Sequence, residues 1–230
     1  MIKKLTNFIV VAAGLSLASS MALASSYKRV YEVTITNITK GQTFTPQLVA
    51  SHNRAISLFT LGEPASSMLE TLAESGNTLP LTDTLMGACR MVTDVQTIDG
   101  LLMPGKSATI DIVAQPGTNR LSIGAMLIPT NDTFVALNSG SLPRRGSKTF
   151  YLKAYDAGTE ANDQLCINIP GPRCGGEPDS APQASDEGFV HVSNGFHDLG
   201  SADDGGNEIL SPFTYDWRNP VAKVVVRRVH

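Results

Sequence analysis

Short segments in which apolar and polar residues alternate recur along this chain, and they constrain its fold more than any other feature. Between Arg29 and Thr36 apolar residues stand at every second position, and the same period recurs at 107–112, 121–127 and 148–155. Alternation of this kind is typical of a strand with one buried face. Asp-Gly and Pro-Gly pairs separate several of the segments, and such pairs form turns. The pattern predicts a mainly β fold, an antiparallel β-sandwich with long loops.

One segment has a different period. Between Pro64 and Gly76 apolar residues recur at helical spacing, with Met68, Leu69, Leu72 and Ala73 on one face. Pro64 suits the first turn of a helix and Gly76 suits its C-terminal cap. The segment 79–89 is ambiguous between helix and strand, and Val92, Val95 and Ile98 in the segment 90–98 fit neither period well. We therefore expect one short helix, which covers an end of the β-structure.

The N-terminus has the pattern of a secretory signal peptide at residues 1–24. Lys3 and Lys4 precede an apolar run at 8–17, and small residues follow it. The run is too short to span a bilayer as a helix. The sequence thus predicts one folded domain at 25–230, which is secreted or periplasmic and has no transmembrane segment.

The charge of the domain is moderately acidic. Without Lys3 and Lys4, 16 of the 18 basic residues remain against 21 acidic ones, which gives a net charge of −5. Proteins that bind nucleic acid usually carry a basic surface, so we expect no nucleic-acid partner. The expected partner is an extracellular or envelope ligand, either protein or glycan; the oligomeric state is not indicated.

Three cysteines lie in the expected domain. Cys166 and Cys174 flank a segment with a Pro-Gly turn, which is able to bring them together as a disulfide in an oxidising compartment. The alternative is that all three thiols are free. With the first two paired, Cys89 is left over, and we expect it to be buried.

The segment Asp156-Ala-Gly-Thr-Glu160 places two carboxylates four residues apart across a glycine. Such a loop is able to direct both carboxylates and a carbonyl to one point. Ca²⁺ prefers oxygen ligands of this kind, whereas zinc prefers nitrogen and sulfur. The alternative is a solvated turn, because Asp and Gly are favoured in turns for local reasons.

Motifs of hydrolytic enzymes are absent from the sequence. It has no Gly-x-Ser-x-Gly and no His-Glu-x-x-His, and its four histidines, His52, His191, His197 and His230, have no ligand spacing. His191 stands within a short strand pattern, where a packed or surface role competes with a role as ligand or base. We therefore expect no enzyme.

Five motifs together resemble the spondin N-terminal (F-spondin) domain family, in a bacterial secreted form. They are Tyr31–Asn37, Pro129–Val135, Tyr155–Glu160, Glu187–Val192 and Asp216–Ala222. The resemblance implies a β-sandwich similar to C2 domains, with a calcium ion held by Asp132, Asp156 and Glu160. Animal members tend to have Asp at the last of these positions. The matrix, integrin and glycolipid partners of animal members are not carried over to this chain.

The leading hypothesis is a secreted calcium-binding module with an adhesion or extracellular binding role. One alternative is a secreted metal-dependent hydrolase in which His191 or His197 acts as the base beside the ion. The other is a structural envelope protein without a ligand. Exposed apolar residues between Ala161 and Gly188 are the candidates for contact with a partner.

Overall fold

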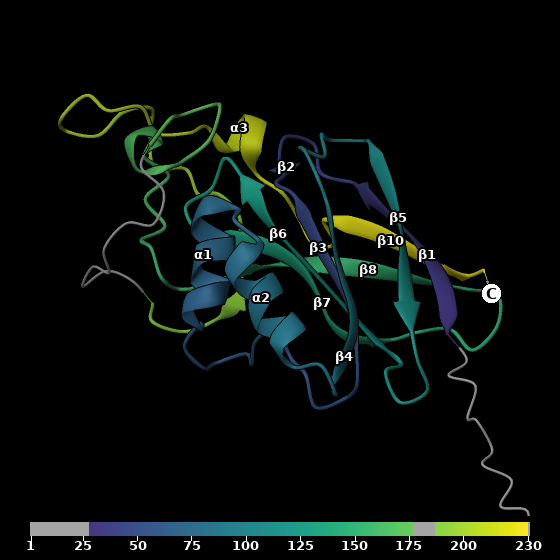
Figure 1. Ribbon diagram of the computed structural model, residues 1–230. Coiled ribbons are helices and arrows are strands. Elements are labelled where there is room, and N and C mark those ends of the chain that lie inside the picture. The colour runs from purple at the N-terminus through teal and green to yellow at the C-terminus, as the bar shows by residue number, and fades with distance from the viewer. Residues whose placement is uncertain (1–27, 177–186, 230) are drawn as a thin grey trace, which may run out of the picture.

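The computed structural model describes residues 28–176 and 187–229 (Figure 1). The predicted signal peptide at 1–24 and the middle of the 161–188 excursion lie outside the described residues. Ten strands form the framework of the described part of the chain. They are β1 (Arg29–Asn37), β2 (Thr43–Phe44), β3 (Gln47–His52), β4 (Val92–Ile98), β5 (Ser107–Ala114), β6 (Arg120–Ile128), β7 (Thr133–Ser141), β8 (Ser147–Asp156), β9 (His191–Val192) and β10 (Ala222–Arg228).

The strands form one antiparallel path with the order β4-β3-β6-β7-β8-β10-β1-β5, and β2 and β9 add to β6 and β8. The path curls until its two ends meet. At that seam the backbone N–H of Val113 in β5 donates to Asp94 Oδ2 in β4 over 2.8 Å, and Ser51 Oγ in β3 donates to the Val113 carbonyl. The predicted mainly β, antiparallel fold is confirmed as a nearly closed barrel. The sandwich and its C2-like arrangement stay predictions.

Apolar residues at alternate positions fill the interior. In β1 Tyr31, Val33 and Ile35 are at most 2% exposed, while their polar neighbours are half-buried. Burial of each large apolar side chain contributes about 1.5 to 3 kcal/mol relative to exposure. Strand β6 is buried on both faces instead, because the barrel interior covers one face and helices cover the other.

Two helices pack on the outside of β6, β7 and β4 (Figure 1). Helix α1 (Ser67–Ser75) is capped by Ser66, whose Oγ accepts from the N–H of Leu69, and by Gly76 at a φ of 68°. Its Leu69 and Leu72 join a second apolar cluster with Phe134 of β7. The predicted helix at 64–75 is therefore confirmed, although it begins at Ser67.

The prediction of a single helix is wrong. Helix α2 (Leu79–Gly87), a short helix α3 (Pro212–Tyr215) and a 3-10 turn at Cys166–Asn168 are also present. Helix α2 buries only Leu81 and Leu85, against α1 and β4, so its apolar stripe is too narrow to stand out in the sequence. None of the helices in the described part of the chain has the length and apolar character needed to cross a bilayer.

Cys166 and Cys174 form a disulfide with their Cα atoms 4.9 Å apart. Close to this bond Ile169 is buried, and Ile167 is 60% exposed. The prediction that Cys89 is buried is wrong. Its thiol is free and exposed, because Cys89 lies just beyond the C-terminus of α2, where the chain passes over the surface toward β4.

Candidate functional site

The predicted carboxylates Asp132 and Asp156 lie at the ends of neighbouring strands. Thr133, the first residue of β7, pairs with Asp156, the last residue of β8. The backbone N–H of Ala157 then donates to the Asp132 carbonyl over 3.2 Å. Antiparallel pairing thus places Asp132, which is 24 positions earlier in the sequence, beside the Asp156 loop.

The loop after Asp156 wraps around the Asp132 side chain. Asp132 Oδ2 accepts hydrogen bonds from the backbone N–H groups of Thr159, at 2.8 Å, and Glu160, at 3.1 Å, and lies 3.3 Å from Thr159 Oγ1. Asp156 Oδ1 accepts from the N–H of Gly158 at 2.9 Å. Asp132, Asp156 and the backbone of Glu160 therefore belong to one hydrogen-bonded unit, and their role as calcium ligands stays a prediction.

Gly158 makes this loop geometry possible. Its φ is 69°, in the left-handed region, and a Cβ atom there would lie 2.3 Å from the carbonyl oxygen of Phe189. The Gly158 carbonyl also accepts a hydrogen bond from the N–H of Gly188 at 2.8 Å. The glycine between the two acids thus lets segment 187–192 pack directly on the loop.

A fourth carboxylate, Glu74, lies beside this unit and was not among the predicted site residues. It is in the last turn of α1, is 1% exposed, and interacts with the Thr159 side chain, Glu160 and Asp132. A signal was available in the sequence. An acid near the C-terminus of a helix opposes the helix dipole, so the place of Glu74 in the last turn of α1 calls for another cause.

The four carboxylates are buried: Asp132 is 0% exposed, Asp156 and Glu74 are 1% exposed, and Glu160 is 4% exposed. Burial raises the pKa of Asp132 to about 8, with a further rise from the Asp156 charge. Burial also raises the pKa of Glu74 to about 8 and that of Asp156 to about 6. Because these shifts come first from loss of solvent, the cluster disfavours its own negative charge.

Two oxygens of the cluster have no hydrogen-bond partner among the described residues, Asp132 Oδ1 and Glu74 Oε1. Nor does any lysine or arginine in the described part of the chain form an ion pair with either side chain. Buried polar atoms are normally paired, and buried charges are normally compensated. An all-oxygen set with unpaired buried oxygens fits a hard divalent cation such as Ca²⁺.

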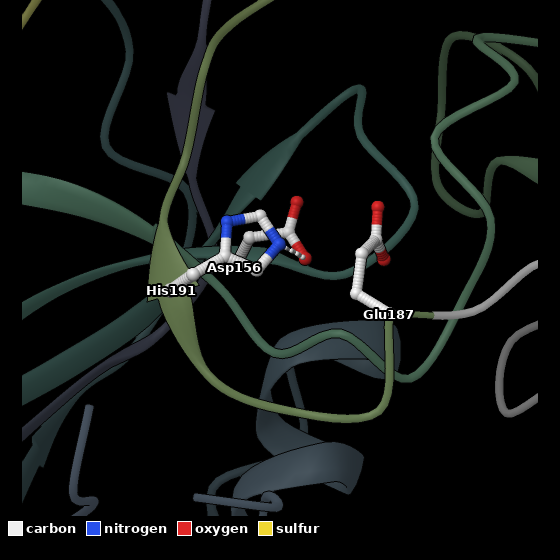
Figure 2. A group of neighbouring side chains, drawn as sticks. All are labelled: Asp156, Glu187 and His191. Carbon is white, nitrogen blue, oxygen red and sulfur yellow. Dashed lines mark ion pairs between the residues drawn. The ribbon is translucent and has the colours of Figure 1, made fainter. Parts of the chain in front are cut away.

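On the other side of Asp156 lies His191, in β9. Its Nε2 is 3.4 Å from Asp156 Oδ1. Glu187 is also near: the three residues each offer one metal-binding atom, and these three atoms lie within 4.8 Å of one another (Figure 2). A role as ligand or base was one of the two roles predicted for His191, whereas Glu187 was not among the predicted site residues. Pairing of β8 with β9 brings His191 to Asp156, and the hydrogen bond from the N–H of Gly188 to the Gly158 carbonyl holds the neighbouring Glu187 beside the same loop.

The other histidines of the described chain have different environments. His197 is exposed. His52 is 0% exposed, and its Nε2 lies 2.8 Å from Ser122 Oγ and its Nδ1 lies 2.7 Å from the Asn53 carbonyl oxygen. Burial lowers the pKa of His52. His52 is thus a satisfied core histidine.

A comparison with protein families finds that the spondin N-terminal family matches residues 24–165, which is more than half of the chain. The match includes Glu74 and the three predicted ligands, and it ends before Glu187 and His191. A comparison with curated proteins finds no match.

Proposed function

Since this chain belongs to the spondin N-terminal family, we propose that it is an extracellular binding module whose buried carboxylate cluster holds a calcium ion. The observation that carries the proposal is the pair of buried oxygens, Asp132 Oδ1 and Glu74 Oε1, that have no hydrogen-bond partner and no basic partner for their side chains among the residues that the structure describes. The disulfide between Cys166 and Cys174 supports a secreted location, because such bonds form in oxidising compartments.

The residues that would hold the ion are Asp132, Asp156, Glu160 and Glu74. When bound, calcium supplies positive charge and takes 6 to 8 oxygen ligands at about 2.3 to 2.6 Å, so carbonyl groups or water would complete the set. The chain itself prepares the site: the N–H groups of Thr159 and Glu160 hold Asp132 Oδ2 in place.

Charge compensation at this cluster would order the loop end of the barrel. Asp132 is bonded to the loop that follows β8, Glu74 belongs to α1, and Gly158 bonds segment 187–192. Loops at one end of a rigid β-framework are a common place for binding surfaces. We infer that the ion orders the surface that contacts the partner, in an adhesion or other extracellular binding role.

Calcium titration by calorimetry tests the metal site. Wild type and an Asp204→Asn control, which alters an exposed aspartate, should bind one calcium ion with the same heat. Asp132→Asn and Glu74→Gln should both weaken that binding, because each removes a charged oxygen ligand. Equal heats for all four proteins would disprove the site.

The binding role needs a separate experiment. The wild-type protein, immobilised, is incubated with extracellular and envelope material, with calcium or with a chelator. A partner that is retained only with calcium, and that Asp132→Asn fails to retain, supports an ion-ordered binding surface. A partner retained equally well with the chelator would separate binding from the ion.

A metal-dependent hydrolase is a second candidate, and one observation favours it. His191 Nε2 lies 3.4 Å from Asp156 Oδ1, so a base would stand beside the ion. Assays of ester, peptide and glycoside hydrolysis with calcium test this function. Activity that His191→Ala removes and His197→Ala keeps would establish it, and equal inactivity of all three proteins would count against it.

A further inference from the structure

Asp156, Glu187 and His191 have the composition of a different kind of metal site from the carboxylate cluster. The set consists of two carboxylates and one imidazole, and the three potential ligand atoms, one from each residue, lie within 4.8 Å of one another. In Figure 2 the ring of His191 and the side chain of Glu187 flank the Asp156 carboxylate. Imidazole nitrogen favours zinc and related transition metals over calcium, which binds oxygen.

The orientation of the His191 ring points to a ligand at Nε2. Its Nδ1 lies 3.2 Å from the carbonyl oxygen of Val192, so in the neutral ring Nδ1 carries the proton and donates it there. Metal-binding histidines commonly have this second hydrogen bond to a carbonyl. Nε2 then directs its lone pair toward Asp156, and it is buried without a hydrogen-bond partner among the described residues.

The spacing of the two atoms agrees with this interpretation. A tetrahedral zinc ion about 2.1 Å from its ligands keeps those ligands about 3.4 Å apart. The observed separation between His191 Nε2 and Asp156 Oδ1 is 3.4 Å. A lone pair facing a carboxylate at this distance is unfavourable unless a cation or a proton stands between them.

The surroundings leave a way for an ion to enter. Asp156 is 1% exposed, so its position is fixed, whereas Glu187 is exposed and its Oε1 accepts a hydrogen bond from Asn162 Nδ2 at 2.9 Å. The ring of Phe189 lies 5.5 Å from the His191 ring and covers it on one side. Two ligands are therefore held by the fold, and the third is able to close over the ion.

We propose that Asp156, Glu187 and His191 form a site for zinc or a similar transition-metal ion, separate from the calcium site but sharing Asp156 with it. The proposal rests in part on the proposed function, because Asp156 would serve both ions. One carboxylate common to two ions makes their binding interdependent. A transition metal would then regulate the calcium-ordered loops.

Zinc and cobalt titrations of the full secreted chain test this proposal. Wild type should bind one zinc ion by calorimetry, and Co²⁺ should give the visible absorption of a tetrahedral site with nitrogen ligation. His191→Ala and Glu187→Gln should each weaken zinc by at least about tenfold, the smallest effect usually seen even for groups that only support a ligand. His197→Ala, an exposed histidine, is the matched control and should bind zinc like wild type.

Two variants separate this site from the calcium site. Asp132→Asn should lose calcium and keep zinc, while Glu187→Gln, at an exposed position, should keep both the fold and calcium. Absence of zinc binding by wild type would overturn the proposal. Equal zinc affinity of wild type and His191→Ala would also overturn it. Neither result would affect the calcium proposal.

Discussion

Replacing Asp132 with asparagine should stabilise the protein in a chelator while removing its stabilisation by calcium. Burial and the neighbouring Asp156 raise the pKa of Asp132 from 3.8 to about 8. In the unfolded chain the carboxyl of Asp132 is ionised at pH 7. Folding without a metal must protonate this carboxyl at a pH about three units above its ordinary pKa, which costs about 4 kcal/mol. Asparagine avoids this cost.

The expected gain is smaller than that limit, because the new amide must also be satisfied. Its oxygen is able to accept from the N–H groups of Thr159 and Glu160, and its NH₂ then faces the neighbouring Asp156. We expect about 2 kcal/mol, which for a domain of this size raises Tm by roughly 4 to 8 °C.

The effect should depend on pH in a defined direction. The folded-state pKa values of Asp132 and Glu74 are raised, so the stability that their protonation confers on the metal-free protein is present at low pH and lost as pH rises toward about 8. The gain from Asp132→Asn should therefore grow between pH 5 and pH 8. In calcium the order should reverse, with wild type more stable than the variant.

Thermal unfolding followed by circular dichroism, with chelator and with excess calcium, measures both arms. Asp204→Asn serves as the control, because it removes one negative charge at an exposed position and should leave Tm unchanged. An Asp132→Asn protein that is less stable than wild type in chelator at pH 8 would refute the electrostatic reasoning. It would show that Asp132 is compensated within the metal-free fold.

Three further predictions concern the framework around the site. Gly158→Ala should destabilise the protein by about 2 kcal/mol or more, because its Cβ would meet Phe189 backbone atoms. The control Gly146→Ala is also at positive φ but has open space around it, so it should cost only about 1 kcal/mol; equal losses of stability in urea unfolding would contradict this. Burial lowers the pKa of His52, so the contribution of His52 to stability is present above pH 6.5 and lost as pH falls. In the presence of calcium, the Tm of His52→Asn should therefore decline less steeply toward pH 5 than that of wild type. Parallel curves of Tm against pH would count against this. Replacing both Cys166 and Cys174 with alanine should lower the free energy of unfolding by about 2.5 kcal/mol, because the disulfide closes a short loop and limits the entropy of the unfolded chain. Cys89→Ser, which removes the free thiol, should leave stability unchanged. Unchanged stability of the double variant in urea unfolding would refute this prediction.

Local sequence patterns predicted much of the fold. Strand β1 was predictable because the period of two of Tyr31, Val33 and Ile35 is itself the condition for burying one face. Helix α1 was predictable because its apolar face and Gly76 are adjacent in sequence. Helix α2 was missed, since Leu81 and Leu85 gain their burial only from α1 and β4.

The residues of the candidate site were likewise predictable only where a local pattern or the family resemblance indicated them. Asp156 and Glu160 were found from their spacing across Gly158, and Asp132 was added by the family resemblance. Glu74 is 58 positions from Asp132, and Glu187 is 31 positions from Asp156, so no local pattern connects them. The sequence by itself therefore determined the β-rich character of the chain and the loop that carries two acids, whereas export stays a prediction. Only the tertiary structure decided which further side chains meet that loop, because packing of α1 on β7 and pairing of β9 with β8 join residues that the chain keeps far apart.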